Sequence, residues 1–263
     1  MSNVTVFAPS LFISHGAPTF AIEPGELGVK LAQLGPSLTG ARAIVVVSPH
    51  WQTQGLSVSS HPLPDTIHDF RGFPDELYKL RYPVAGDPDI AQRVVSALHD
   101  GGLQAQLDPA QGLDHGVWVP LLHLRPQADI PVICLSLPID TTPQSAWELG
   151  QALAPLRQQN IVVLGSGSMT HNLAEFRGPA VTAVAPYVTE FTTWIRDNVQ
   201  SRDQAALTAY RTRAPHAVRA HPSEEHLLPL FVAIGATDER DQFEILTKEV
   251  RHGMLSMETF YWH

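Results

Sequence analysis

Short, continuous runs of apolar residues alternate along this chain with stretches that carry apolar residues at three- and four-residue spacing. Runs without alternating polar positions are typical of strands buried on both faces of a sheet, while the longer spacing predicts amphipathic helices. The predicted strands, each bounded by Gly, Pro or Ser, are residues 11–14, 43–48, 132–137 and 161–165. The predicted helices are residues 87–98, 143–157 and 187–199. This alternation predicts an α/β fold with a central, mostly parallel or mixed sheet flanked by helices on both faces.

One segment breaks the periodicity. Residues 61–86 contain four prolines among several aromatic side chains, and we interpret them as a long functional loop or lid. Further along the chain, residues 226–234 predict another helix, and residues 243–247 and 255–261 predict two more strands. Because no repeat, low-complexity segment or linker-like change of composition occurs, we expect residues 1–263 to form a single domain.

The charge balance argues against several classes of partner. The chain has 26 acidic and 17 basic residues, a formal net charge of -9, and no run rich in Lys or Arg. Nucleic acid and anionic membrane surfaces attract basic patches, so we expect the protein to bind neither. The composition leaves the oligomeric state open between a monomer and a small homo-oligomer.

Cysteine usage indicates the compartment and the chemistry of any metal site. Cys134 is the single cysteine, so no internal disulfide can form. The beginning of the sequence lacks the pattern of a signal peptide, and no apolar run approaches the ~20 residues of a membrane span. We therefore expect a cytoplasmic location, and a metal site here would be built from His and carboxylates rather than thiolates.

Histidine is unusually frequent, with 13 copies, and several copies stand where predicted strands end. His15 follows the strand 11–14, His50 follows the strand 43–48, and His171 closes a glycine- and serine-rich segment after the strand 161–165. Sheets of this class place their ligand site beyond the carboxyl ends of the strands. Three imidazoles are thus expected at one edge of the sheet.

Further candidates come from predicted loops and from the start of the helix 226–234, namely His115, His221 and His226. Neutral imidazole is a common ligand of Fe(II) and Zn(II), but the spacings match no short metal-binding signature. The alternative for each histidine alone is a capping or hydrogen-bonding role. Asp114, Glu224 and Glu225, which are adjacent or close to these histidines, could orient the rings or remain solvated. His68 is the other histidine expected to touch a substrate.

Five ordered motifs together resemble the 4,5-DOPA extradiol dioxygenase family of class III ring-cleaving dioxygenases. They are Ser-His-Gly-Ala-Pro at 14–18, Ser-Pro-His-Trp at 48–51, Leu-Asp-His-Gly at 113–116, Gly-Ser-Gly-Ser-Met-Thr-His-Asn-Leu at 165–173 and His-Pro-Ser-Glu-Glu-His at 221–226. The resemblance extends from Leu11 to about Phe260. It implies a phosphorylase/hydrolase-like α/β fold, with residues 1–263 as one catalytic domain. It also implies a non-haem Fe(II) centre, often occupied by Zn(II) in purified bacterial members, that cleaves a catechol such as L-DOPA with O2.

The resemblance also implies roles for individual histidines. His15 and His50 correspond to two metal ligands, and His226 is our choice for the third, with His221, Glu224 and Glu225 as alternatives nearby. His171 resembles the acid/base histidine of the family. The resemblance also implies that it lies close enough to the metal to be counted as a fourth ligand. His115 resembles the histidine that helps to bind substrate or oxygen. These two residues are our catalytic candidates.

Two other functions remain open from the residues themselves. The same imidazole cluster could hold Zn(II), lower the pKa of its bound water towards ~7 and hydrolyse a substrate. Alternatively, the protein could bind metal tightly without any turnover. The aromatic residues of the segment 61–86 favour a ring-shaped substrate and therefore the dioxygenase.

Overall fold

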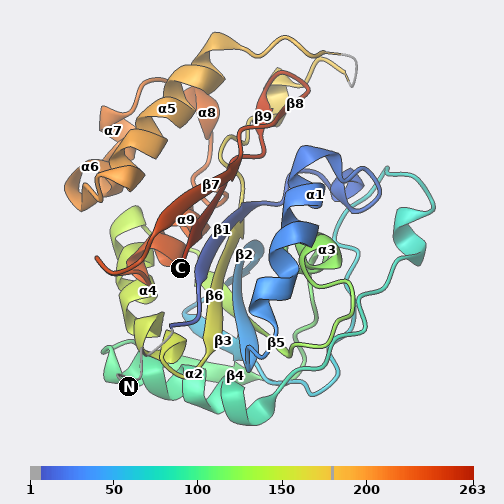
Figure 1. Ribbon diagram of the computed structural model, residues 1–263, viewed down its shortest axis with the longest axis vertical. Coiled ribbons are helices and arrows are strands. Elements are labelled where there is room, and N and C mark those ends of the chain that lie inside the picture. The colour runs from blue at the N-terminus through green and yellow to red at the C-terminus, as the bar shows by residue number, and fades with distance from the viewer. Residues whose placement is uncertain (1–6, 179–180) are drawn as a thin grey trace.

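A computed structural model describes residues 7–178 and 181–263, and its centre is an eight-stranded sheet (Figure 1). The strands of this sheet are β1 (Ser10–Ser14), β2 (Ala43–Thr53), β3 (Leu56–Ser59), β4 (Ala105–Asp108), β5 (Val132–Pro138), β6 (Ile161–Gly167), β7 (Phe243–Thr247) and β10 (Thr259–Trp262). Their order is β4-β3-β5-β2-β6-β1-β10-β7. The neighbours β5, β2, β6 and β1 run parallel, whereas β10 and β7 pair antiparallel beside β1. The predicted mixed α/β sheet is confirmed.

Helices cover both faces of the sheet, also as predicted. The helices are α1 (Gly25–Leu34), α2 (Pro88–Asp100), α3 (His115–Leu124), α4 (Pro143–Arg157), α5 (Pro186–Gln200), α6 (Gln204–Thr208), α7 (Tyr210–Arg213), α8 (Ala217–Ala220) and α9 (Leu228–Gly235). Alternate residues of β2 enter two different cores: Val45 packs with α2, α4, α5 and α9, whereas Val46 packs with α1 and α3. This alternation is the two-residue period of a strand buried on both sides.

Several element bounds differ from the sequence-based expectation. Strand β2 does not end at Ser48 but continues to Thr53 after an irregularity in its pairing with β5. The strand predicted at 255–261 is split into β9 (Leu255–Ser256), which pairs with β8 (Val250–Arg251), and β10. The helix predicted at 226–234 begins at Leu228 instead.

The segment 61–86 packs against the core instead of forming a free lid, and we call it the wall segment. Phe70, Leu77 and Tyr82 are buried in the core that contains α1 and α3. The backbone N–H of Ile67 donates to the carbonyl of Leu113, and the Tyr82 hydroxyl donates to the carbonyl of Arg125 at 2.8 Å. A loop whose aromatic side chains and backbone groups are tied to the core keeps its position beside the sheet edge.

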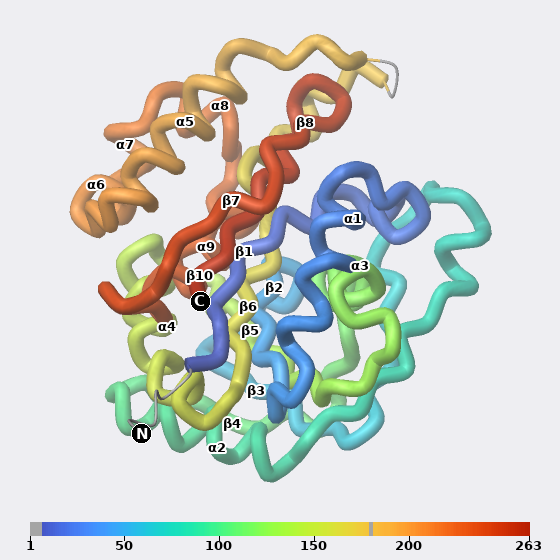
Figure 2. Tube along the Cα trace, viewed as in Figure 1, coloured from blue at the N-terminus to red at the C-terminus, as the bar shows by residue number. Residues whose placement is uncertain are grey.

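The chain trace in Figure 2 places the N-terminal and C-terminal strands side by side, in agreement with the pairing of β1 and β10. In the part of the chain that the structure describes, no helix combines the length and the apolar character needed to cross a membrane.

Candidate metal centre and comparison with known proteins

Two of the predicted histidines extend from the central parallel strands. His15 directly follows β1 and is 1% exposed, and Gly16 turns the chain away with a φ of +63°. His50 lies in β2, within the irregular stretch between Val47 and Gln52 where regular pairing with β5 is interrupted. The irregularity aims His50 at the sheet edge instead of the core, which is a common use of a bulge.

His115 does not lie in a loop, as the sequence suggested, but is the first residue of helix α3. The carboxylate of Asp69, in the wall segment, makes two contacts with His115. One carboxylate oxygen accepts from the His115 backbone N–H at 2.9 Å, and the other lies 2.9 Å from its Nδ1. The same carboxylate lies 3.7 Å from Nδ1 of His50. Asp69 therefore caps the helix and orients two rings.

His171 and His226 form the opposite side of the cluster. Their rings are stacked, with centroids 3.6 Å apart and planes 7° from parallel. The backbone N–H of His171 donates to the Ala220 carbonyl, and the carbonyl of His226 accepts from the N–H of Ser168. These bonds join the segment after β6 to the segment before α9, so that the two imidazoles are held against each other.

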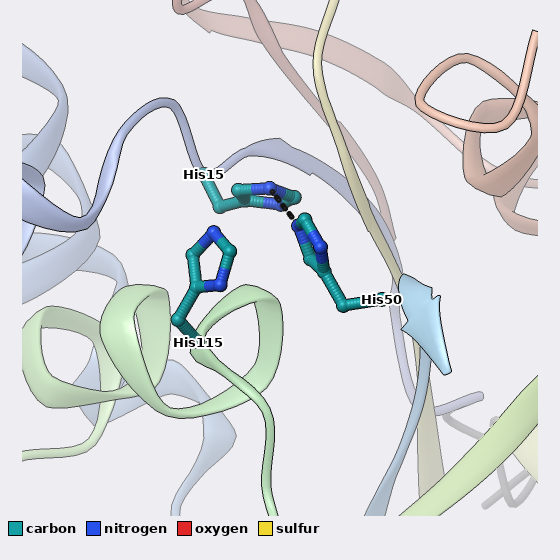
Figure 3. A group of neighbouring side chains, drawn as sticks. All are labelled: His15, His50 and His115. Atoms are coloured by element: carbon teal, nitrogen blue, oxygen red, sulfur yellow. Dashed lines mark hydrogen bonds between the residues drawn. The ribbon is translucent and has the colours of Figure 1, made fainter. Parts of the chain in front are cut away.

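The five histidines surround one spot at the sheet edge. The Nε2 atoms of His15 and His50 are 3.2 Å apart, and Figure 3 shows His115 turned towards the same pair. Ring centroids are 4.0 Å apart for His50 and His115 and 5.1 Å apart for His50 and His226. Possible ligand atoms cluster in two groups, one of His15, His50 and His115 and one of His171, Glu225 and His226.

Hydrogen bonds determine which ring nitrogens are free. The Ser166 hydroxyl donates to the Gly116 carbonyl, so its oxygen accepts a hydrogen bond from Nδ1 of His15, 3.0 Å away. Asp69 in the same way accepts from Nδ1 of His115, and Glu225 from Nδ1 of His226 at 3.1 Å. Each ring then carries its proton on Nδ1 and presents an unprotonated Nε2.

Burial and crowding favour the neutral form of three of the imidazoles. Burial, followed by the neighbouring imidazoles His115 and His226, lowers the pKa of His50 to about 2. Burial, followed by His226 and His221, lowers the pKa of His171 to about 3, and burial, followed by His50 and His115, lowers that of His15 well below its usual range. Burial alone would raise the pKa of Asp69, but its hydrogen bond to His115 lowers it overall. Neutral imidazoles such as those of His15, His50 and His171, close to a carboxylate, are suited to a divalent cation.

The spacing of the nitrogens also fits a metal ion. Two nitrogen ligands that each lie about 2.0–2.1 Å from one tetrahedral ion are separated by ~3.3–3.4 Å. The 3.2 Å between the Nε2 atoms of His15 and His50 is close to this value. The geometry of these residues is therefore that of a site able to hold a metal.

Other predicted residues lie outside the cluster. His221 is fully buried, its Nε2 lies 3.0 Å from the Met169 carbonyl, and it belongs to neither group of possible ligand atoms. Asp114, which we considered as a partner of His115, instead accepts a hydrogen bond from the Ser48 hydroxyl at 2.6 Å. His68 packs against Phe70 and Trp118 behind the site. Sequence reasoning identified Glu225, which orients His226, but missed Asp69 and Ser166, which orient His115 and His15.

A cavity of about 240 Å³ opens at the histidines. Its polar lining consists of imidazoles, and its apolar lining comes from the loop after β1, the wall segment and the β9 region. The lining residues are Gly16, Ala17, Pro18, His50, Phe70, Phe73, His115, His171, Leu173, His226 and Leu255. The cavity thus combines aromatic walls with a floor of imidazoles.

The family model for the catalytic LigB subunit of aromatic ring-opening dioxygenase matches residues 11–260, nearly the whole chain. The chain belongs to the LigB family. The matched range contains all five histidines of the cluster, and the resemblance drawn from the five motifs is confirmed.

The names of individual relatives of this LigB-family protein agree with the family assignment. The chain is 37% identical to 4,5-DOPA dioxygenase extradiol of Beta vulgaris over 94% of this chain and 93% of that one. It is also 37% identical to the protein of that name in Escherichia coli, over 95% and 92% of the two chains. The crystal structure of an uncharacterized protein from Escherichia coli K12 superposes with a TM-score of 0.78 at 28% identity, covering 97% of this chain and 99% of that chain.

Proposed function

We propose that the protein is a metal-dependent extradiol dioxygenase that inserts O2 into the ring of a catechol, with an L-DOPA-like aromatic as the model substrate. The observation that carries this proposal is the convergence of imidazoles, three of them with Nδ1 hydrogen-bonded and Nε2 free, at a cavity lined by Phe70 and Phe73. A ring can lie between such aromatic walls while its two hydroxyls point towards the imidazoles. Membership in the LigB family supports the same reaction.

We propose Fe(II) as the functional metal, with Zn(II) as a plausible occupant of the purified protein. His15, His50 and His226 would hold it, and His171, stacked on His226, is the candidate for a fourth ligand. His226 presents a free Nε2 because Glu225 accepts from its Nδ1. Bound Fe(II) would supply the redox chemistry that joins O2 to the catechol ring.

The chain itself supplies positioning and proton transfer. A catechol must lose protons to become a good ligand, and the neutral imidazole of His171 at the cavity wall can accept one. Its lowered pKa makes it a weaker base than free histidine, but the negative charge of a bound catecholate would raise that pKa again. His115, held by Asp69, is positioned to donate or accept a hydrogen bond at the same face of the cavity.

The experiment that tests this function compares two metals. Metal-free protein is reconstituted anaerobically with Fe(II) or with Zn(II), then mixed with L-DOPA, catechol and aerated buffer. We expect one O2 consumed per catechol and a yellow ring-opened product with Fe(II) only. Hydrolysis of an ester or amide with Zn(II), and no O2 uptake with Fe(II), would instead support a zinc-dependent hydrolase with the same histidine cluster. Tight metal binding without either reaction would support metal storage.

Replacing Asp69 tests the role of residues that contact the imidazoles without binding the metal themselves. Replacing Asp69 by Asn removes the charge that faces the proposed ligand His50 at 3.7 Å, and we expect metal affinity to fall about 10-fold, the low end for groups behind metal ligands, with little change in thermal stability. Competition with a chelator measures the affinity. Asp75→Asn, on the same wall segment, is the matched control and should bind metal like the unaltered protein; equal affinities for both variants would contradict the role of Asp69.

We further propose that residues 1–263 act as one catalytic domain in the cytoplasm, as a monomer or small homo-oligomer. The small catechol and O2 would be its partners. The acidic balance and the absence of basic runs in the sequence support a function without nucleic acid or membrane surfaces.

A further inference from the structure

A second cavity, of about 330 Å³, adjoins the one at the histidines. The two cavities share four apolar lining residues: Ala17, Phe73, Leu173 and Leu255. The second cavity extends from there along the segment that precedes α1 and the β8–β9 hairpin, which lie near each other in Figures 1 and 2. A molecule whose ring occupies the first cavity can therefore extend a substituent into the second.

The walls of the second cavity are mostly apolar. Besides the shared residues, Phe176 and Met254 line it, and its polar lining comes from Thr19, Glu23 and His252. His252 packs edge-on against Phe176, with centroids 5.2 Å apart. Among the residues that the structure describes, no Lys or Arg lines this cavity. The acid Glu23 is its one lining residue with a permanently charged side chain.

The mouth of the second cavity exposes large apolar side chains. Leu173 is 68% exposed and Phe176 is 46% exposed. Adjacent exposed apolar residues beside a cavity mark a surface that a ligand covers, because covering it removes apolar area from water. Both residues follow His171 closely in the chain, so the same segment would contact the ring and the substituent.

We propose that the second cavity binds the ring substituent of the substrate, and that this substituent is an extended arm with apolar groups along its length and no net negative charge at its end. The inference rests on the proposed dioxygenase function, because that function places the ring in the first cavity. Apolar walls select the length of the arm, and Glu23 at the outer wall disfavours a second negative charge. The substrate class is thus a catechol whose arm has no net negative charge, which includes the zwitterionic arm of L-DOPA and disfavours an arm that ends in a lone carboxylate.

The length of the arm is tested with 4-methyl-, 4-ethyl- and 4-propylcatechol and the Fe(II) enzyme. Each buried methylene is worth ~0.8 kcal/mol, so kcat/KM is expected to rise about fourfold per methylene, mainly through KM. Phe176→Ala should shrink the ratio between the propyl and methyl compounds. Val184→Ala is the matched control, because Val184 is an exposed apolar residue that lines neither cavity, and it should leave the ratio unchanged. Equal kcat/KM across the series would overturn the proposal.

The charge of the arm is tested with 3-(3,4-dihydroxyphenyl)propanoate and its methyl ester. The ester is expected to have a kcat/KM a few-fold higher at low salt, and the difference should shrink as salt screens Glu23. Glu23→Gln should reduce the difference in the same way, while Glu26→Gln, which changes an acid that lines neither cavity, should not. A preference for the free acid would overturn the assigned end group.

A binding measurement separates this inference from the proposed reaction. Calorimetry compares 4-propylphenol with 4-methylphenol, which lack the second hydroxyl and are not expected to turn over. Tighter binding of the propyl compound, lost in Phe176→Ala, supports the arm cavity even if no catechol is opened. Turnover of every catechol at the same kcat/KM, together with equal binding of the two phenols, rejects the arm cavity and leaves the dioxygenase function standing.

Discussion

Replacing His15 by Ala is expected to abolish metal retention and ring opening without unfolding the protein. His15 is 1% exposed, Ser166 fixes its tautomer, and its Nε2 lies 3.2 Å from that of His50. Because altering groups behind metal ligands already costs about 10- to 100-fold in affinity, the loss of a ligand should exceed a hundredfold. Metal content by mass spectrometry measures this, and circular dichroism checks the fold.

The same measurement distinguishes the third ligand. His50→Ala and His226→Ala should also lose the metal, whereas His115→Ala should retain it and lose activity. Full metal occupancy in both His15→Ala and His50→Ala would reject the assignment of the site. If His115→Ala loses the metal while His226→Ala keeps it, the third ligand is His115, which lies with His15 and His50 in one group of possible ligand atoms.

Replacing His171 by Gln is expected to leave the metal bound and to lower kcat by about 10²- to 10⁴-fold, the usual contribution of a general acid or base. Burial and the neighbouring His226 lower the pKa of His171 to about 3, so the imidazole is neutral at pH 7 and free to take a proton from the catechol. Gln keeps a polar side chain at the cavity wall but cannot accept that proton.

Steady-state kinetics with the Fe(II) enzyme tests the role of His171. A loss confined to kcat supports proton transfer, while an undiminished rate rejects it. If metal content falls in parallel with kcat, His171 acts as a ligand. The matched control is His68→Gln, because His68 also packs among aromatic rings but does not line the cavity.

The central sheet could be predicted because its strands are buried on both faces. Both faces of a strand such as β5 are covered by helices, so almost every residue of the strand is buried and its sequence is an almost continuous apolar run. Helix α3 was missed, since it starts at the Asp114-His115-Gly116 sequence of a loop and contains Pro120, which normally disfavours a helix interior. The short strand β4 was also missed, because it lies at the edge of the sheet and its four residues include only two apolar positions, Ala105 and Leu107.

The residues of the candidate site also fall into those that could be predicted from the sequence and those that could not. His15, His50 and His171 could be located because the ends of parallel strands meet at one edge of the sheet, whatever the lengths of the connections. Asp69 and Ser166 could not, since each acts across a distance in sequence that no local pattern encodes. Asp69 is 46 residues from His115, and Ser166 is 151 residues from His15.

The pairing of the first and last strands has a consequence for how the protein matures. His15 follows β1, which pairs with β10, and His226 precedes α9, so the histidines meet only when segments far apart in the chain have been ordered. Contacts so distant in sequence cost more loop-closure entropy than local contacts. A nascent or truncated chain would therefore present no complete cluster, and a metal would bind only after folding. Once acquired, a metal present at a hundred times its Kd would stabilise the whole domain by about 2.7 kcal/mol, so metal supply and protein lifetime would be coupled.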